Sequence, residues 1–106
     1  MAKYMITGSY TVDGIKGVLK EGGTGRRKAV ETAIKAMGGH LEAFYYTFGT
    51  HDVFGIAEIP DNVTAVALAM GIASTGTINV STTVLLTPEE IDQAAKKVVA
   101  FRGAGQ

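Results

Sequence analysis

A histidine and an aspartate stand side by side at His51 and Asp52, in a chain that contains two histidines. In catalysis, such a pair can supply a general base and the carboxylate that orients it. Neighbouring residues of a strand point to opposite faces, so Asp52 cannot orient the imidazole if both lie in one strand. In a turn, aspartate accepts hydrogen bonds from backbone N–H groups and histidine tolerates a positive φ. We favour the turn, and keep His51 as a candidate acid–base group at the mouth of a pocket.

Tyrosine and hydroxyl side chains are the next candidates. A tyrosine on a half-buried strand usually lies in the core with its hydroxyl bonded, but such a hydroxyl can also transfer protons. We therefore name Tyr10, with His51, as a candidate catalytic residue. The side chains that we expect to line a ligand pocket are those of Tyr10, Thr7, Ser9 and Tyr46, with hydroxyls from residues 77–86.

The segment Gly22-Gly23-Thr24-Gly25 precedes Arg26 and Arg27 and superficially resembles a phosphate-binding loop. It matches neither the dinucleotide fingerprint nor the Walker A motif, because no Gly-Lys-Ser/Thr closes it. A helix that begins after these glycines would still place two arginines where they could hold a carboxylate or phosphate. We favour the alternative, in which Arg27 pairs with Glu31 and Arg26 covers a subunit edge.

Metal binding has little support in the sequence. There is no cysteine, which excludes disulfides, thiolate zinc sites and iron–sulfur clusters. His40 and His51 lie at the two ends of one expected strand, about 30 Å apart at 3.3 Å per residue, so one subunit cannot bring both to one ion. We predict no metal and no cofactor.

Length and charge narrow the function classes further. A chain of 106 residues is expected to form a single domain, residues 1–106, with a core at about 3–98 and a frayed tail at 102–106. Ten basic residues balance ten acidic ones, so nothing in the net charge favours nucleic acid. The N-terminus lacks a signal-peptide core and the longest apolar run, 63–73, is too short to span a bilayer. We expect a cytoplasmic protein with no membrane partner.

Hydrophobic periodicity and turn residues predict the elements that would position these side chains. Strands are predicted at 3–11, 40–48, 52–59 and 77–86, and helices at about 14–37, 63–74 and 88–98, the first interrupted by its glycines. The expected helix N-caps are Asp13, Thr24 after the glycines, then Asp61 or Asn62, and finally Thr87 in a capping box with Glu90. The last helix is expected to bury a stripe made of Ile91, Ala94, Ala95 and Val98.

The order β-α-β-β-α-β with a C-terminal helix is that of an α+β, ferredoxin-like fold with an antiparallel sheet. Within it, we expect the first and third strands to be adjacent and parallel. That would gather Tyr10, Glu58, His40 and Thr77 at one end of the sheet. His51 and Asp52 would lie at the opposite end, near Lys3 and Thr87.

Two features favour self-association. The segment 63–74 carries no charge on any face, and a helix that is apolar all round is usually buried on more than one side. A sheet covered by helices on one face only also needs a cover for the other. A second copy on that face would give a dimeric α+β barrel that encloses a cavity.

Three stretches together resemble the GYD-domain family: GTGRRKAVE at 23–31, MGGHLEAFYYTFGTHDVFGIAEIPD at 37–61 and LLTPEE at 85–90. These are small, mostly bacterial proteins of the dimeric α+β barrel class. In the Gly-Tyr-Asp signature, Gly49 and Asp52 match, and His51 stands where the family usually has tyrosine. The family has no generally assigned activity, so the resemblance implies fold and assembly rather than chemistry.

Three functions remain open at this point. We prefer a homo-oligomer, a dimer or larger, that binds a small organic or anionic ligand in a pocket between paired sheets. The first alternative is a cofactor-independent enzyme, of the monooxygenase or isomerase kind, that acts on a small organic molecule. The second is a purely structural or regulatory oligomer. The residues alone do not decide whether the protein is an enzyme.

Overall fold

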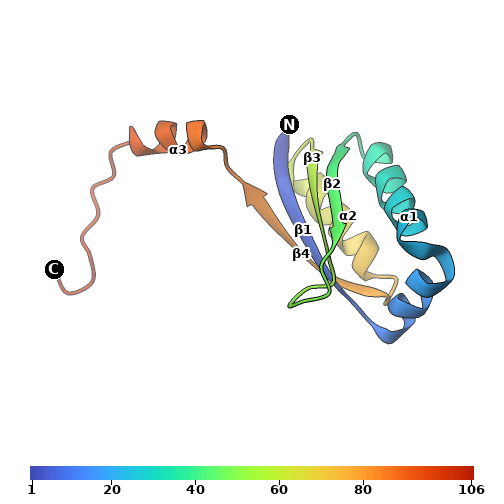
Figure 1. Cartoon of the computed structure of the whole chain (residues 1–106). Coiled ribbons are helices and arrows are strands. Elements are labelled where there is room, and N and C mark those ends of the chain that lie inside the picture. The colour runs from blue at the N-terminus through green and yellow to red at the C-terminus, as the bar shows by residue number, and fades with distance from the viewer.

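The computed structural model describes all of residues 1–106 and has seven elements. They are β1 (Ala2–Tyr10), α1 (Val12–Ala36), β2 (His40–Tyr46), β3 (Val53–Ile59), α2 (Asn62–Ala73), β4 (Ile78–Leu85) and α3 (Pro88–Ala95). The four strands form one antiparallel sheet in the order β2-β3-β1-β4. In Figure 1, α1 and α2 lie on one side of the sheet and α3 stands apart from both. The predicted α+β, ferredoxin-like fold is confirmed.

The predicted direction of one strand pair is wrong. β1 and β3 are antiparallel, with Gly8 opposite Val53 and Lys3 opposite Glu58. The reason lies in the connections: α1 crosses over between β1 and β2, which therefore run in the same direction, and β3 returns from β2 through a short hairpin to lie between them. It is therefore antiparallel to both neighbours.

This correction rearranges the two ends of the sheet. Tyr10 lies at the same end as Asp52, whose carboxylate oxygen Oδ2 accepts a 2.8 Å hydrogen bond from the Tyr10 backbone N–H. Glu58 lies at the opposite end, across from His40 on β2. The expected grouping of Tyr10 with Glu58 and His40 therefore does not exist.

Thr11, rather than Asp13, caps α1. Its side-chain oxygen accepts from the Gly14 N–H at 3.2 Å, and Asp13 lies in the first turn. Gly14 is buried because the start of β4 passes close by: a Cβ placed on it would lie 1.9 Å from the Thr77 carbonyl oxygen. The glycine interruption is confirmed as a kink at Gly22, where φ is 79° and ψ is 163°.

The core lies between the sheet and the two helices that cover it. Tyr4, which is 2% exposed, donates its hydroxyl hydrogen bond to the Asn62 side chain at the start of α2. The other buried members are Ile34, Ala57, Ile59, Ala65 and Leu68. Asp61 caps α2 by accepting from the Thr64 N–H at 2.8 Å, and this bond holds the pKa of its carboxyl below the usual value.

The sheet has a covered and an open face. On β1, Tyr4 and Gly8 are buried toward the helices, so Met5, Thr7 and Ser9 face the other way. Side chains of the same open face come from the neighbouring strands and include Phe54, Ile56, Ser81, Thr83 and Leu85. Nothing in the chain covers this face with a helix (Figure 1).

The capping box of α3 is confirmed. The Glu90 N–H donates to Thr87 Oγ1 at 3.1 Å, and the Thr87 N–H donates to Glu90 Oε1 at 3.0 Å. The predicted burial of its apolar stripe is wrong within this chain, because Ile91 is 51% exposed and Val98 97%. β4 runs into α3 through a short connection that carries the helix away from the body (Figure 1).

Candidate functional site

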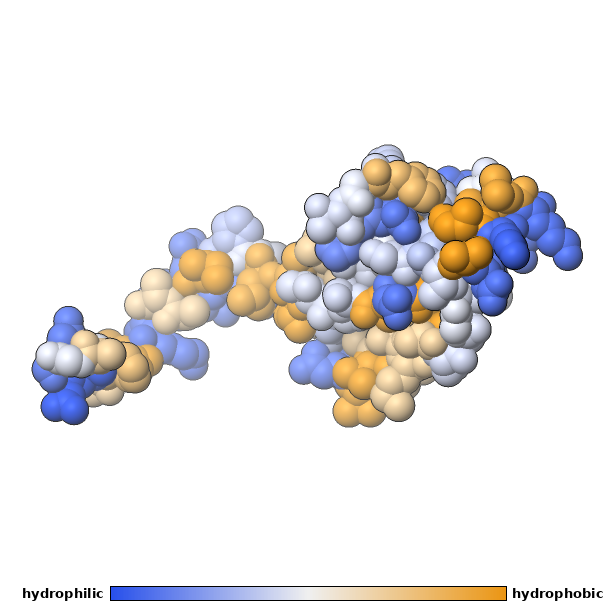
Figure 2. All heavy atoms as spheres, turned by 90° about the horizontal axis from the view of Figure 1, so that it is seen from below, coloured by the Kyte–Doolittle hydropathy of each residue, from blue (hydrophilic) through white to orange (hydrophobic).

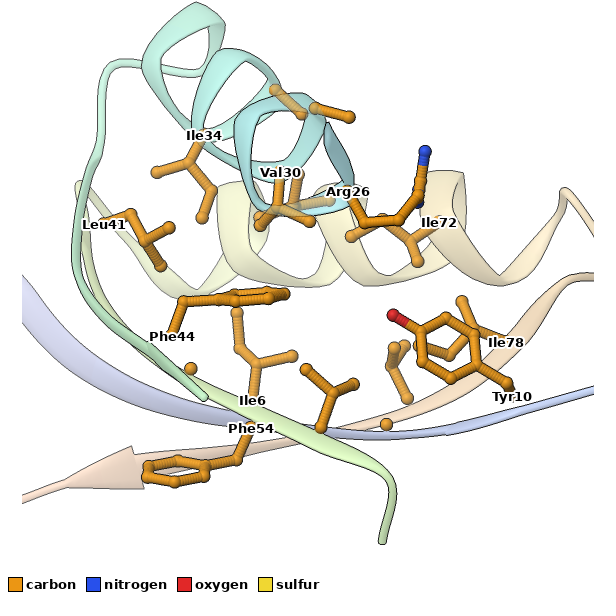
Figure 3. Close-up of a pocket in the computed structure, with 17 residues that line it drawn as sticks. Ile6, Tyr10, Arg26, Val30, Ile34, Leu41, Phe44, Phe54, Ile72 and Ile78 are labelled. Carbon is orange, nitrogen blue, oxygen red and sulfur yellow. The ribbon is translucent and has the colours of Figure 1, made fainter. Parts of the chain in front are cut away.

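A cavity of about 160 Å³ lies between the sheet, α1 and α2. Fourteen of its seventeen lining residues are hydrophobic, so its interior is an apolar environment. Figure 3 shows the arrangement: Val30 and Ile34 descend from α1, the ring of Phe44 lies across the floor, and Ile72 approaches from α2. An apolar cavity of about this size can hold a ring the size of benzene.

The polar end of this cavity is formed by Tyr10 and Arg26. In Figure 3 the Tyr10 hydroxyl points into the cavity, and the stem of Arg26 lies over it with the nitrogen end turned outward. Arg26 Nη1 is 3.0 Å from Glu21 Oε2, in a partly exposed ion pair. One side of the guanidinium is thus engaged, and its remaining N–H groups are not bound to this carboxylate.

A polar hollow lies next to the cavity and shares part of its wall. Tyr10, Arg26, Ile72 and Ile78 line both spaces. The hollow, of about 270 Å³, is otherwise lined by Asp13, Gly14, Gly17, Glu21, Thr75 and Thr77. A molecule bound here would thus have an apolar part under α1 and a polar part at the end of β1.

The electrostatic surroundings keep Tyr10 neutral. Burial, followed by the nearby Tyr46 and then the Asp52 carboxylate, raises the pKa of Tyr10 to about 12, and Arg26 opposes this rise in part. At neutral pH its hydroxyl is therefore a hydrogen-bond donor and not a base. The hydrogen bond that the Tyr10 backbone N–H donates to the Asp52 carboxylate fixes the end of β1 on which this side chain stands.

Tyr46 supports the site from beside the kink of α1. Its hydroxyl donates to the Gly23 carbonyl at 3.1 Å, and a Cβ on Gly23 would lie 3.0 Å from the ring. The absence of a side chain at Gly23 therefore lets the kinked helix approach the ring closely. Tyr46 also packs edge-on against Phe44 of the cavity floor, with ring centroids 5.4 Å apart.

The structure divides the predicted ligand-binding residues between two faces. Tyr10 and Arg26 meet at the cavity, with Tyr46 beside them. Thr7 and Ser9 lie on the open face, because they alternate with the residues that face the helices. The structure does not bring these two hydroxyls to Tyr10.

Arg27 points elsewhere. Its Nε atom is 3.8 Å from Glu31 Oε1, which confirms the expected pairing. Together these two residues line a shallow hollow against β2 and lie outside the apolar cavity.

His51 and Asp52 belong to the junction between β2 and β3, as the turn interpretation predicts. The Gly49 N–H and the Thr47 hydroxyl both donate to the His51 carbonyl, at 2.8 and 2.6 Å. His51 is exposed and does not line the cavity. The positive φ in this junction belongs to Phe48, not to His51.

His40 lies on β2 opposite Glu58, at the far end of the sheet from His51. No group of three or more histidine, cysteine, aspartate or glutamate side chains in the chain is arranged to hold a metal ion. No helix combines the length and the apolar character needed to cross a bilayer.

The sequence did not reveal the cavity. Its lining residues, such as Ile6, Val30, Phe44 and Ile78, have the pattern of ordinary core positions. An apolar residue that lines a void and one that fills a core have the same sequence signature. The glycine kink before Arg26 and the tyrosine at the end of the first strand, Tyr10, were the local signals that pointed to this region.

Fold and site together define an α+β, ferredoxin-like domain with one covered sheet face and a small apolar cavity beneath the helices. The GYD domain family model matches residues 4–95, and the chain belongs to this family. Neither a comparison with curated proteins nor one with solved structures finds a match. Family membership therefore confirms the resemblance without supplying a substrate or ligand.

Proposed function

We propose that this protein binds a small amphipathic anion, with the apolar part in the cavity under α1 and the charged head at Tyr10 and Arg26. The observation that supports the proposal is the combination of an apolar cavity with a neutral phenol and a guanidinium at its polar end. A carboxylate is the head group that suits both, because arginine binds it through paired N–H groups.

The size of the cavity limits the apolar part. A volume of about 160 Å³ suits one aromatic ring or a short alkyl chain. Benzoate and hexanoate are therefore suitable probes. This site lies on the helix side of the sheet, whereas the sequence led us to expect a ligand between two sheets.

We propose in addition that the protein acts as a homodimer, with the open faces of two sheets directed toward each other. The support is the uncovered face, which carries Met5, Phe54, Ile56 and Leu85 among small hydroxyl residues. The outer side of α2, with Val63, Val66 and Met70 exposed, is a second uncovered apolar surface.

Binding is better supported than catalysis. A tyrosine with a pKa of about 12 does not accept protons at neutral pH, and His51 stands outside the cavity. The enzyme with Tyr10 or His51 as acid–base group remains an alternative, as does the purely structural oligomer. Neither has an observation of its own in the site.

Calorimetric titration of benzoate and hexanoate, with benzamide and hexanol as neutral counterparts, tests the charged head. We expect Arg26→Gln to weaken the binding of both acids about 10- to 100-fold, because a hydrogen bond to a charged group is worth about 1.5–3 kcal/mol. Arg27→Gln is the matched control, since Arg27 pairs with Glu31 outside the cavity, and should bind as the wild type does. Equal affinity for acids and neutral counterparts would overturn the anionic head.

A further inference from the structure

The chain exposes more surface than a compact protein of its size. Its accessible surface is 7311 Å², against about 5,700 Å² expected for a compact monomer of 11.1 kDa. The radius of gyration is 16.9 Å, where a compact chain of this length has about 13 Å. The excess of about 1,600 Å² exceeds the roughly 800 Å² that each partner buries in a standard interface.

Residues 86–106, which we call the C-terminal arm, stand away from the body and contribute to this excess (Figure 1). Its large hydrophobic side chains are Leu86, Ile91, Val98, Val99 and Phe101, and all of them are more than half exposed. Figure 2 shows hydrophobic atoms along the arm up to the point where it joins the body. The sequence nevertheless specifies α3 fully, with Pro88 in its first turn and a complete capping box.

A helix of this length needs a packing partner. Isolated helices shorter than about 12–15 residues are marginal in water, and α3 has eight residues. Its apolar stripe has no counterpart within the chain. The chain thus carries a helix with a preformed cap and an uncovered apolar stripe.

The position of the arm favours a second copy of this chain as the partner. Figure 1 shows the arm continuing from the end of the edge strand β4, on the other side of the sheet from α1. A second copy seated on the open face would lie within reach of the arm. The two-fold arrangement would also bury both arms at once, which accounts for an excess of this size in each chain.

We propose that the arm of each copy packs against the second copy in a reciprocal exchange. Its α3 stripe then contacts the rim of the open face, at Tyr45 of the partner subunit. Tyr45 stands on the edge strand β2 and is 61% exposed, stacked on Phe54 of the open face. This inference rests on the proposed dimer, and adds that the C-terminal arm holds its two copies together.

Sedimentation of the full chain tests the exchange. Ile91→Asp places a charge in the stripe, and should weaken dimerisation at least tenfold. Gln93→Asp adds the same charge to the same helix outside the stripe, and should leave the dimer unchanged. Because α3 packs on nothing in its own body, both variants should keep the wild-type thermal unfolding of the sheet with α1 and α2 at concentrations where the chain is monomeric.

Cross-linking tests the contact between the two copies. The reaction is specific to the introduced cysteines, because the chain contains no cysteine of its own. A Val98→Cys chain is mixed with a Tyr45→Cys chain and treated with a short bismaleimide. We expect the crossed product in quantity, and little of it when Val12→Cys, also on an exposed site, replaces Tyr45→Cys.

Each outcome is decisive. A dimer that Ile91→Asp weakens no more than Gln93→Asp overturns the arm exchange and leaves the proposed dimer in place. A monomeric wild type overturns both. Equal cross-linking to positions 45 and 12 contradicts the contact at Tyr45. Ile91 does not line the cavity, so Ile91→Asp should bind benzoate as the wild type does. This titration therefore tests the ligand proposal independently of the arm exchange.

Discussion

Ile34 of α1 is 1% exposed and Ile91 of α3 is 51% exposed, although both lie on the apolar stripe of a capped helix. Both helices follow the same local rules, with Thr11 and Thr87 as side-chain caps. They differ in what lies opposite the stripe: the sheet for α1, and nothing in the same chain for α3. Capping and periodicity thus specify a helix and its apolar side, but not the molecule against which that side packs.

The largest effect expected from this comparison is on stability. Ile34→Ala should lower the free energy of unfolding by about 2–5 kcal/mol, because it leaves a cavity in the core. Ile91→Ala should change it by less than about 0.5 kcal/mol at concentrations where the chain is monomeric. Denaturant unfolding of both variants checks this. Similar losses would mean that the arm packs on its own body.

Two glycines of α1 should respond in opposite directions. Gly14→Ala should destabilise by about 1–3 kcal/mol or more, because the new methyl group would collide with the Thr77 carbonyl. Gly17 has open space where a Cβ would stand, so Gly17→Ala should stabilise the helix by up to about 1 kcal/mol. Thermal unfolding distinguishes the two. A tolerated Gly14→Ala would contradict the close approach of α1 to β4.

The two threonine caps, Thr11 and Thr87, should differ in how much of the protein they stabilise. Loss of a threonine cap costs a helix about 1 kcal/mol. Thr11→Ala should therefore lower the stability of the whole body by that amount. Thr87→Ala should reduce the helical signal of the arm and leave the unfolding of the monomeric body unchanged. If Thr87→Ala shifted that unfolding as much as Thr11→Ala does, the claim that α3 packs on nothing in its own chain would be contradicted.

The smallest effect concerns Tyr10 in alkali. Since folding raises its pKa from 10.0 to about 12, its neutral form stabilises the fold fully below pH 10, and this contribution is lost as the pH rises from 10 to 12. Tyr10→Phe should show a shallower loss of stability over that window. Tyr45→Phe, at an exposed site, should keep the wild-type profile. Identical profiles for wild type and Tyr10→Phe would contradict the burial of this hydroxyl.

Local features of the fold were predictable because they depend on neighbouring residues. The glycine kink, the capping box at Thr87 and Glu90, and the hairpin at His51 and Asp52 all follow from short stretches of sequence. Strand direction and long-range packing did not follow so directly. The antiparallel pairing of β1 with β3 depends on how the hairpin places β3, and the parallel expectation misplaced Glu58.

The candidate site was predicted only in part. Tyr10, Tyr46 and Arg26 were identified by their chemistry, and the structure brings them to one region. The sequence placed the pocket between paired sheets; Thr7 and Ser9 lie on the open face, whereas Tyr10 and Tyr46 lie on the covered face. The cavity itself depends on the spacing between α1, α2 and the sheet, which no local pattern encodes.

The central claim is that the cavity under α1 is the ligand site, and the most direct test is to fill it. Ala33 lines the cavity, so Ala33→Leu should abolish calorimetric binding of benzoate while the protein stays folded. Ala36→Leu makes the same change at an exposed position of the same helix, and should bind as the wild type does. Unchanged benzoate binding by a folded Ala33→Leu protein would contradict the claim.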